Sequence, residues 1–231
     1  MREHNRLFCR AVAERLECPG PVVEFGAFQV AGEEALADLR GLFPGRPYVG
    51  CDLRPGTGVD RIEDVSRPTF APGSVGTVLC LETLEHVFEV RRAFDAIHGI
   101  LAPGGVFVMT SPFDFKIHAH PEDYWRMTPE CLRRMLRPYG ARLVAAQGVR
   151  TWPHTVMAVA VKAPVPPAAR AALDGVLPRY RELVVAARGA RAWRVRARER
   201  LARLYRSKGE RRKLAGFATV EGVVEDGPTP A

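Results

Sequence analysis

The sequence lacks the features that point to a membrane-spanning, zinc-bound or disulfide-bonded protein. No apolar run among its 231 residues reaches the roughly 18 residues that a membrane-spanning helix needs. The N-terminal segment is amphipathic and has no apolar signal core, so we expect a cytoplasmic protein. The cysteines are odd in number, and none forms a CxxC pair or joins a histidine in zinc spacing. We therefore expect reduced, mostly buried thiols and no structural metal at the five cysteines, which are Cys9, Cys18, Cys51, Cys80 and Cys131.

Aromatic residues are also sparse, at 8%, but 47% hydrophobic and 26% charged residues are typical of a globular chain. This composition argues against a disordered or fibrous protein, and the length suits one α/β domain with additional pieces. The net charge of +8 is uneven, because residues 179–213 hold 14 Lys and Arg against three Glu. The remainder of the chain is therefore slightly acidic, and the basic character belongs to a C-terminal stretch.

Hydrophobic patterning predicts strands that alternate with helices between residues 20 and 162. Strands are expected at 21–26, 48–53, 59–65, 74–81, 106–110, 142–146 and 155–161. Helices are expected at 2–17, 32–42, 84–101 and 128–136, the last with Thr128 as N-cap and Pro129 in the first turn. This alternation predicts an α/β fold with a doubly wound, mostly parallel sheet that ends in an antiparallel hairpin.

A proline-rich linker after Lys162 separates this domain from an arginine-rich C-terminal part. We divide the chain into a domain at 1–163, a basic helical extension at 164–215, with helices at 168–187 and 189–206, and a flexible tail at 216–231. The apolar stripe of the second helix, formed by Trp193, Leu201 and Leu204, would pack on the body or on a second subunit, giving a homodimer. Two other interpretations are a surface for a polyanion such as RNA and a flank that attracts an anionic small substrate.

In a doubly wound sheet, ligands bind at the carboxyl ends of the strands, so the residues that follow each strand are the informative ones. Acidic residues stand at or near several of these ends, at Glu24, Asp52, Asp64 and Glu82. An acid after the second strand of a nucleotide-binding sheet typically holds ribose hydroxyls, which favours that role for Asp52. The alternatives are a plain strand-end acid at Asp52, a capping role for Glu24 and simple loop solvation for Asp64.

Two segments, LETLEHV at 81–87 and LAPGGVFVMTSPF at 101–113, resemble the class I S-adenosylmethionine-dependent methyltransferases in order and spacing. The segment HPEDYWRMTPECL at 120–132 is similar to a type 11-like branch that carries HPxDYWRxTPExL. The resemblance covers roughly residues 20–162. It implies a seven-stranded Rossmann-like sheet and S-adenosyl-L-methionine as the cofactor.

The resemblance also implies which residues bind the cofactor: Glu24, Gly26, Ala27, Phe28, Asp52, Leu53, Asp64, Val65, Leu81 and Glu82. The loop around Gly26 would face the methionine part of the cofactor, and Asp52 would bridge the ribose hydroxyls. Asp64 would lie at the adenine edge, and Leu81 with Glu82 beneath the cofactor. The family loop carries three glycines, whereas this chain keeps only Gly26 and continues with AFQV. A non-catalytic, partner-binding member of the fold, with Phe28 or Gln29 in the cleft, is therefore an alternative.

The reaction that the resemblance implies is direct displacement, in which a nucleophile attacks the sulfonium methyl in line. A general base helps if that nucleophile is a hydroxyl or a protonated amine. The candidates lie after the fourth and fifth strands: His86, His118, His120 and Asp123. Tyr124 and Arg126 would orient the acceptor. The alternatives are a helix cap at His86 and a structural lid for the rest, and the two lid histidines have no third residue at metal-ligand spacing.

These observations predict a methyltransferase that acts on a small molecule, such as a sugar, a nucleotide sugar or a secondary metabolite. The alternatives are an RNA methyltransferase that docks through the arginine-rich helices and the non-catalytic member of the fold. Salt dependence separates the RNA alternative, since a polyanion complex weakens steeply as ionic strength rises.

Overall fold

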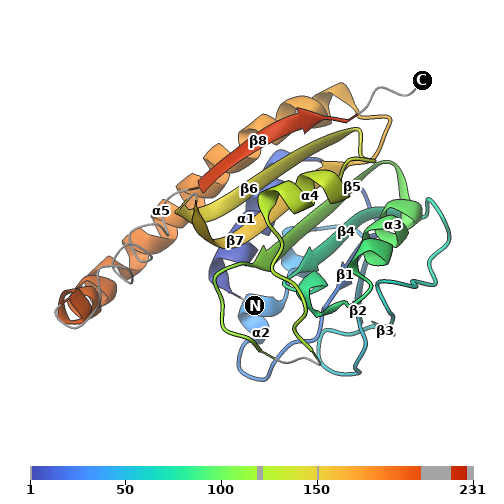
Figure 1. Ribbon diagram of the computed structural model, residues 1–231. Coiled ribbons are helices and arrows are strands. Elements are labelled where there is room, and N and C mark those ends of the chain that lie inside the picture. Colours follow the sequence, from blue (N-terminus) through green and yellow to red (C-terminus); the bar gives the residue numbers. More distant parts are fainter. Residues whose placement is uncertain (1, 119–121, 150, 204–219, 228–231) are drawn as a thin grey trace.

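The protein is an α/β fold built on one eight-stranded sheet, seen in a computed structural model that describes residues 2–118, 122–149, 151–203 and 220–227 (Figure 1). The strand order is β3-β2-β1-β4-β5-β7-β6-β8. In chain order the strands are β1 Val22–Phe25, β2 Tyr48–Asp52, β3 Arg61–Ile62, β4 Val75–Leu81, β5 Leu101–Pro112, β6 Ala141–Val149, β7 Trp152–Val161 and β8 Val220–Asp226.

The sheet has a parallel half and an antiparallel half. Strands β1 to β5 pair in parallel, whereas β7 pairs antiparallel with both β5 and β6. Residues 141–161 thus form the predicted terminal hairpin. The doubly wound, mostly parallel sheet is confirmed, with eight strands in place of the seven expected.

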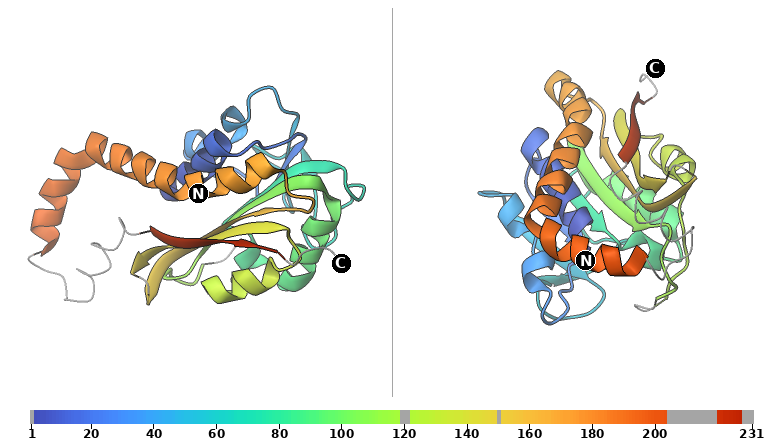
Figure 2. Two further views of the ribbon diagram at one scale, coloured as in Figure 1. Left: turned by 90° about the horizontal axis from the view of Figure 1, so that it is seen from above. Right: turned by 90° about the vertical axis from the view of Figure 1, so that its left-hand side faces the viewer.

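Helices cover both faces of the sheet (Figure 2). Helices α1 (Glu3–Arg15) and α5 (Pro167–Arg203) pack over one face, while α3 (Val90–Ile100) and α4 (Pro129–Met135) pack over the other. Each face has its own apolar cluster, which is expected when parallel strands are buried on both sides. In the part of the chain that the structure describes, no helix combines the length and apolarity that crossing a membrane would demand.

Two predicted helices are interrupted, and in both places other parts of the chain bond to the main-chain carbonyls. The helix expected at 32–42 consists of α2 (Glu34–Ala37) and a 3-10 turn, η1 (Arg40–Leu42). The Arg6 guanidinium donates to the carbonyls of Leu36 and Asp38 between them. The helix expected at 84–101 divides into a 3-10 turn, η2 (Leu84–His86), and α3, because the loop after β5 bonds to a carbonyl of η2.

The C-terminal part also differs from the prediction, because one continuous helix, α5, replaces the two expected at 168–187 and 189–206. Its first half packs on α1, where Tyr180 meets Phe8 edge to face and Arg179 pairs with Glu14. Figure 2 shows the second half extending beyond the sheet. The side chains of residues 188–219, including the Trp193 stripe proposed for a dimer contact, lie outside the description.

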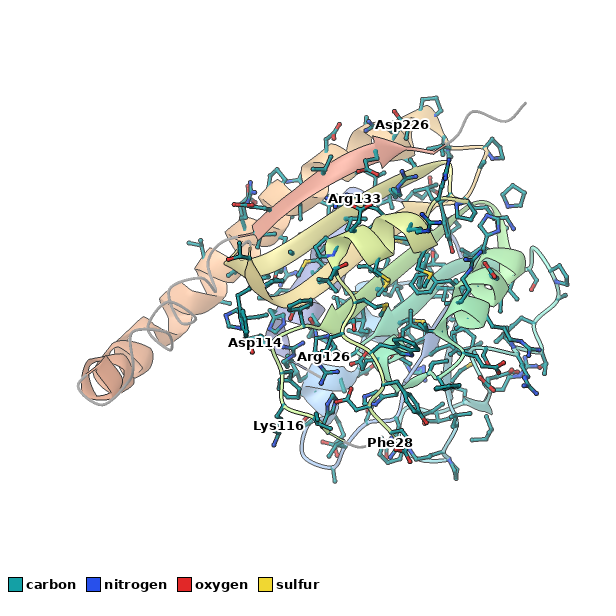
Figure 3. The ribbon with its side chains drawn as sticks, in the orientation of Figure 1. Phe28, Asp114, Lys116, Arg126, Arg133 and Asp226 are labelled. Atoms are coloured by element: carbon teal, nitrogen blue, oxygen red, sulfur yellow. The ribbon has the colours of Figure 1, made fainter. Side chains whose placement is uncertain are left out.

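Residues 220–226, which we expected in a flexible tail, form the edge strand β8 beside β6. The expectation of a flexible tail overlooked the alternation of Val220, Gly222 and Val224. The two valines contact the apolar cluster under α5. Glu225, on the opposite face, pairs with Arg133 of α4, which Figure 3 labels together with Asp226 of β8.

The expected burial of most of the cysteines is confirmed. Each is a free thiol, and four of them are buried. Burial raises the pKa of the Cys18 thiol to about 12, so that this group stays protonated and inert at neutral pH.

Candidate active site

The carboxyl ends of β2, β1, β4 and β5 lie side by side, because these strands are parallel neighbours in that order. The loops that follow them therefore meet at one edge of the sheet. Figure 3 shows Phe28 from the β1 loop at this edge, with Asp114, Lys116 and Arg126 from the loop after β5. The structure thus brings most of the predicted site residues to one edge of the molecule.

The turn after β1 depends on the one glycine that this loop retains. Gly26 has a φ of +86°, and a Cβ added there would lie 2.2 Å from the Thr83 hydroxyl oxygen. The main-chain N–H groups of Gly26 and Ala27 both donate to the carbonyl of Cys51 on β2. Only glycine fits this combination of positive φ and close approach, so the turn holds the ends of β1, β2 and β4 together.

Glu24 lies on β1 just before this turn, with 5% of the residue exposed. Its carboxyl accepts a 2.6 Å hydrogen bond from the hydroxyl of Tyr48. Burial raises the pKa of Glu24 to about 7, against the lowering effect of the Tyr48 bond. Glu24 is therefore bonded within the core beneath the strand ends, and both its predicted contact with the cofactor and the capping alternative stay predictions.

Asp52, at the end of β2, holds its own loop and that of β1 in place. Its Oδ2 accepts from the main-chain N–H of Phe28 at 3.3 Å, and its Oδ1 from the N–H of Arg54 at 3.0 Å. The Arg54 guanidinium lies 4.3 Å from the centre of the Phe28 ring. A Cβ on Gly56 would collide with the same ring, so Phe28 packs on the β2 loop and not on Gly26.

The residues of this edge fit an adenosyl group by their chemistry. Each oxygen of the Asp52 carboxylate has two lone pairs, so the bonds from Phe28 and Arg54 leave acceptor capacity for a hydroxyl group on Oδ2, and Oδ1 has a second lone pair that only the long contact with the Arg54 side chain reaches. Leu53 and Ile62 offer apolar surface nearby, with 59% and 54% of each residue exposed. At the end of β5, the buried hydroxyls of Thr110 and Ser111 have no hydrogen-bond partner among the described residues.

Asp64 and Val65 shape the loop that follows β3. Asp64 accepts two 2.8 Å hydrogen bonds from Ser66, one from the main-chain N–H and one from the hydroxyl, and Val65 is buried. The neighbouring Glu63, which sequence reasoning missed, is buried and bonds to both the N–H and the hydroxyl of Thr69. The hydrogen bonds of the Glu63 and Asp64 carboxylates therefore fix the conformation of this loop, which follows the exposed Ile62.

At the end of β4, Leu81 is buried and Glu82 takes a positive φ of 54°, which is unusual for a residue other than glycine. The Glu82 carboxylate pairs with Arg2, whose guanidinium also stacks on the Phe115 ring. Burial alone would raise the pKa of Glu82, but Arg2 keeps that pKa below its usual value. The N-terminus therefore contributes Arg2 to the site, and no sequence spacing indicated this.

The loop after β5 is fastened across η2 by main-chain hydrogen bonds. The N–H groups of Tyr124 and Trp125 both donate to the carbonyl of Glu85, at 2.8 and 3.3 Å. The Trp125 indole donates to the carbonyl of Val87, and Tyr124 packs edge to face on Phe88. The two aromatic residues thus anchor a lid, although 43% of Tyr124 and 38% of Trp125 remain exposed.

Asp123 holds the lid together and is poorly suited to accept a proton. Its side chain is almost fully buried and forms a two-pronged ion pair with Arg126, at 2.5 and 2.7 Å. It also accepts from Nδ1 of His118 at 2.9 Å. The Arg126 hydrogen bonds hold the pKa of Asp123 well below its usual range, which favours the structural-lid alternative; the roles of Asp123 as a base and of Arg126 in orienting the acceptor stay predictions.

His86 and His118 lie beside each other, with ring centres 4.7 Å apart. They flank the buried carboxyl of Glu85, which is fully shielded from solvent, and burial raises the pKa of Glu85 to about 8. One ligand atom from each of the three residues lies within 4.8 Å of the other two. Sequence spacing did not reveal this cluster, because Glu85 and His118 are far apart along the chain, and His120 lies outside the described residues.

Comparison with known proteins agrees with this geometry. Residues 40–109 match the family model described as a methyltransferase domain. The CMeT domain of the citrinin polyketide synthase is similar at 16% identity and a TM-score of 0.50, over 67% of this chain and 50% of that one. Comparison with curated protein sequences gives no match.

Two further solved structures are similar at a TM-score of 0.49. One is an S-adenosylmethionine-dependent methyltransferase from Mesorhizobium loti, at 16% identity over 68% of this chain and 98% of that one. The other belongs to a complex of a methyltransferase with the Haloferax volcanii Trm112 methyltransferase activator, at 18% identity over 69% and 89%.

The strand order and the similarity to the CMeT domain show the same fold, and residues 40–109 match a methyltransferase domain. The predicted resemblance to the S-adenosylmethionine-dependent class is confirmed as a similarity of fold and of this segment. The narrower branch that carries HPxDYWRxTPExL stays a prediction.

Proposed function

We propose that the protein is an S-adenosylmethionine-dependent methyltransferase that methylates a small molecule by direct in-line transfer. The observation that carries this proposal is the Asp52 carboxylate at the end of β2, directly beside the Gly26 turn. It stands where a class I fold brings the ribose of its cofactor, and it keeps unused acceptor capacity for hydroxyl hydrogen bonds.

On the cofactor side, Asp52 accepts hydrogen bonds from the ribose, and the exposed Leu53 and Ile62 give the adenine ring an apolar surface. The loop at Asp64 borders the adenine edge. When bound, the cofactor supplies an electrophilic methyl group on a sulfonium and leaves as a neutral thioether. The chain contributes mainly by holding the acceptor in line with that methyl group and by excluding water.

On the acceptor side, the lid and η2 surround the cluster of Glu85, His86 and His118. An acceptor hydroxyl must lose its proton as the new bond forms, and the imidazole Nε2 atoms are the bases at hand. The lid supports a small acceptor, because its main-chain bonds to Glu85 fasten it over the strand ends. A sugar, nucleotide sugar or secondary metabolite fits such a covered site.

One observation favours the second candidate, a non-catalytic member of the fold that binds a partner. The Asp52 carboxylate already accepts from Phe28 and Arg54, so parts of this chain occupy some of the positions that ribose hydroxyls would take. A ribose hydroxyl can displace these contacts from the Asp52 carboxylate. The hydrogen bond from Phe28 is long, and the Arg54 side chain that pairs with Asp52 is largely exposed to solvent. We therefore prefer the enzyme.

Calorimetric titration with S-adenosylhomocysteine tests the choice. The native chain is expected to bind one molecule, and Asp52→Asn to bind it about tenfold more weakly or worse, since hydrogen bonds to a charged acceptor are among the stronger ones. Asp95→Asn, on the exposed face of α3, is the matched control and should bind like the native chain. Absence of binding to the native chain would overturn the proposal in favour of the non-catalytic member, and equal affinity in Asp52→Asn would overturn the role of Asp52 that carries it.

A further inference from the structure

Glu85 is the least expected polar residue of the site. Its side chain has no exposed surface, and neither carboxyl oxygen has a hydrogen-bond partner among the described residues. A buried carboxyl group without a partner is costly, and native proteins rarely keep one without a reason. Its main-chain carbonyl is bonded to the lid at Tyr124, so the residue is fixed in place. A buried, fixed and unsatisfied carboxyl points to a ligand.

The two neighbouring histidines are oriented by groups that can only accept hydrogen bonds. Nδ1 of His86 lies 2.5 Å from the carbonyl oxygen of Glu122, and Nδ1 of His118 lies 2.9 Å from Oδ2 of Asp123. Both Nδ1 atoms therefore carry the hydrogen, and the lone pair of each ring is on Nε2. Asp123 is also paired with Arg126, and its contact with His118 forms a carboxylate–histidine unit of the kind that supports metal ligands.

The ligand atoms of the three residues converge. Nε2 of His86 lies 3.9 Å from Oε1 of Glu85, and the three ligand atoms are all within 4.8 Å of one another. Atoms about 2.1 Å from a shared ion lie roughly 3 to 4 Å apart, so a slight contraction of the lid brings all three into range. We propose that Glu85, His86 and His118 form a binding site for one divalent transition-metal ion.

The ligand set indicates which ions fit. Two imidazoles and one carboxylate suit Zn²⁺, Fe²⁺, Co²⁺ or Ni²⁺, whereas Mg²⁺ and Ca²⁺ prefer oxygen ligands throughout. Asp123 belongs to the supporting shell, because it bonds to a ligand and to Arg126. Three protein ligands also leave coordination positions open, as in catalytic sites.

The role of the ion rests on the proposed function, although its binding does not. An acceptor hydroxyl that binds at an open position has its pKa lowered, so its proton passes to water and the oxygen is left as the nucleophile. The new C–O bond then forms as the C–S bond of the sulfonium breaks. With the ion bound, His86 and His118 act as ligands and a separate base is not needed.

The test uses the full chain after dialysis against a chelator. Titration with Co²⁺ is followed by visible d–d absorption, and titration with Zn²⁺ by calorimetry. One ion per chain is expected, and Glu85→Gln and His118→Gln should each weaken binding by about tenfold or more. His98→Gln, on α3 and outside the cluster, is the matched control and should bind like the native chain.

Two comparisons separate loss of the metal site from misfolding of a variant and from failure of the proposed function. Glu85→Gln preserves the size of the side chain, and circular dichroism with S-adenosylhomocysteine titration checks that both variants fold. No ion bound by the native chain, or native affinity in both variants, would overturn the metal site. Metal binding without S-adenosylhomocysteine binding would instead leave the site standing and overturn the proposed function.

Discussion

At the scale of single residues, the sheet edge holds carboxyl groups in very different surroundings. Asp52 is reached by solvent and bonds to main-chain N–H groups, whereas Glu24 is enclosed by the core and has Tyr48 as its hydrogen-bond donor. Burial disfavours the ionised form, so the enclosed Glu24 carboxyl loses its proton at a higher pH than usual. This contrast leads to a prediction on stability.

Glu24→Gln should remove a pH dependence from the stability of the fold. The pKa of Glu24 rises from 4.5 to about 7 on folding, so the folded state binds this proton more tightly. The unfolding free energy is therefore highest below pH 4.5 and falls as pH rises to about 7, by about 3 kcal/mol from this group. Urea unfolding at pH 5 and pH 8 should show a fall in stability that is about 3 kcal/mol smaller in the variant than in the native chain, because Glu85 titrates over the same range in both.

Glu17→Gln, at a solvent-exposed position beyond α1, is the control and should follow the native pH profile. The interpretation fails if Glu24→Gln loses stability between the two pH values as steeply as the native chain does.

The single residues also show what the sequence could predict. The position of Asp52 could be predicted because a buried strand ends in this acidic residue. The positive φ of Gly26 could be predicted because the loop that follows the first strand of this fold needs glycine. Glu85 and Arg2 could not be assigned in this way. Their roles depend on the path of the lid and of the N-terminus, which bring together residues far apart in the chain.

At the scale of elements, α4 is the helix whose start the sequence predicted most fully. Thr128 takes an extended conformation, and its hydroxyl accepts a 3.1 Å hydrogen bond from the N–H of Cys131, with Pro129 in the first turn. The capping hydrogen bond joins residues that are close in the sequence, so the sequence alone predicts it correctly. The predicted helices at 32–42 and 84–101 are interrupted because distant groups bond to their carbonyls, and periodicity contains no information on such bonds.

Thr128→Ala should destabilise the fold by about 1 kcal/mol, because α4 loses the acceptor for a main-chain N–H group at its first turn. Thr128→Ser keeps the hydroxyl and is the matched control, so its urea midpoint should stay close to that of the native chain. An equal loss in both variants would show that the methyl group of Thr128, and not its hydroxyl, supports this end of the helix.

At the scale of the whole molecule, α5 and β8 complete the fold although the family match ends at residue 109. Strand β8 covers the edge of β6 along residues 141–147, and an uncovered edge invites pairing with other chains. Asp226 of β8 pairs with Arg170 of α5 at 2.5 Å, and Val220 accepts a hydrogen bond from Arg181 at 2.6 Å. The C-terminal segment therefore closes both the sheet edge and the apolar cluster beneath α5.

Gly222→Val tests whether this closure depends on close packing between β8 and its neighbours. A Cβ at Gly222 would lie 2.7 Å from both the Ala145 Cβ and the Leu177 Cδ1, so the strand must shift away from β6 and α5. Hydrogen exchange of peptides that span residues 141–147 should then become about tenfold faster or more, since overpacking of this kind costs about 1 to 3 kcal/mol. Glu221→Val adds the same side chain on the opposite, exposed face and should leave the exchange unchanged. Native protection in Gly222→Val would mean that β8 is held mainly by its main-chain ladder and the Arg170 ion pair, and that packing against α5 contributes little.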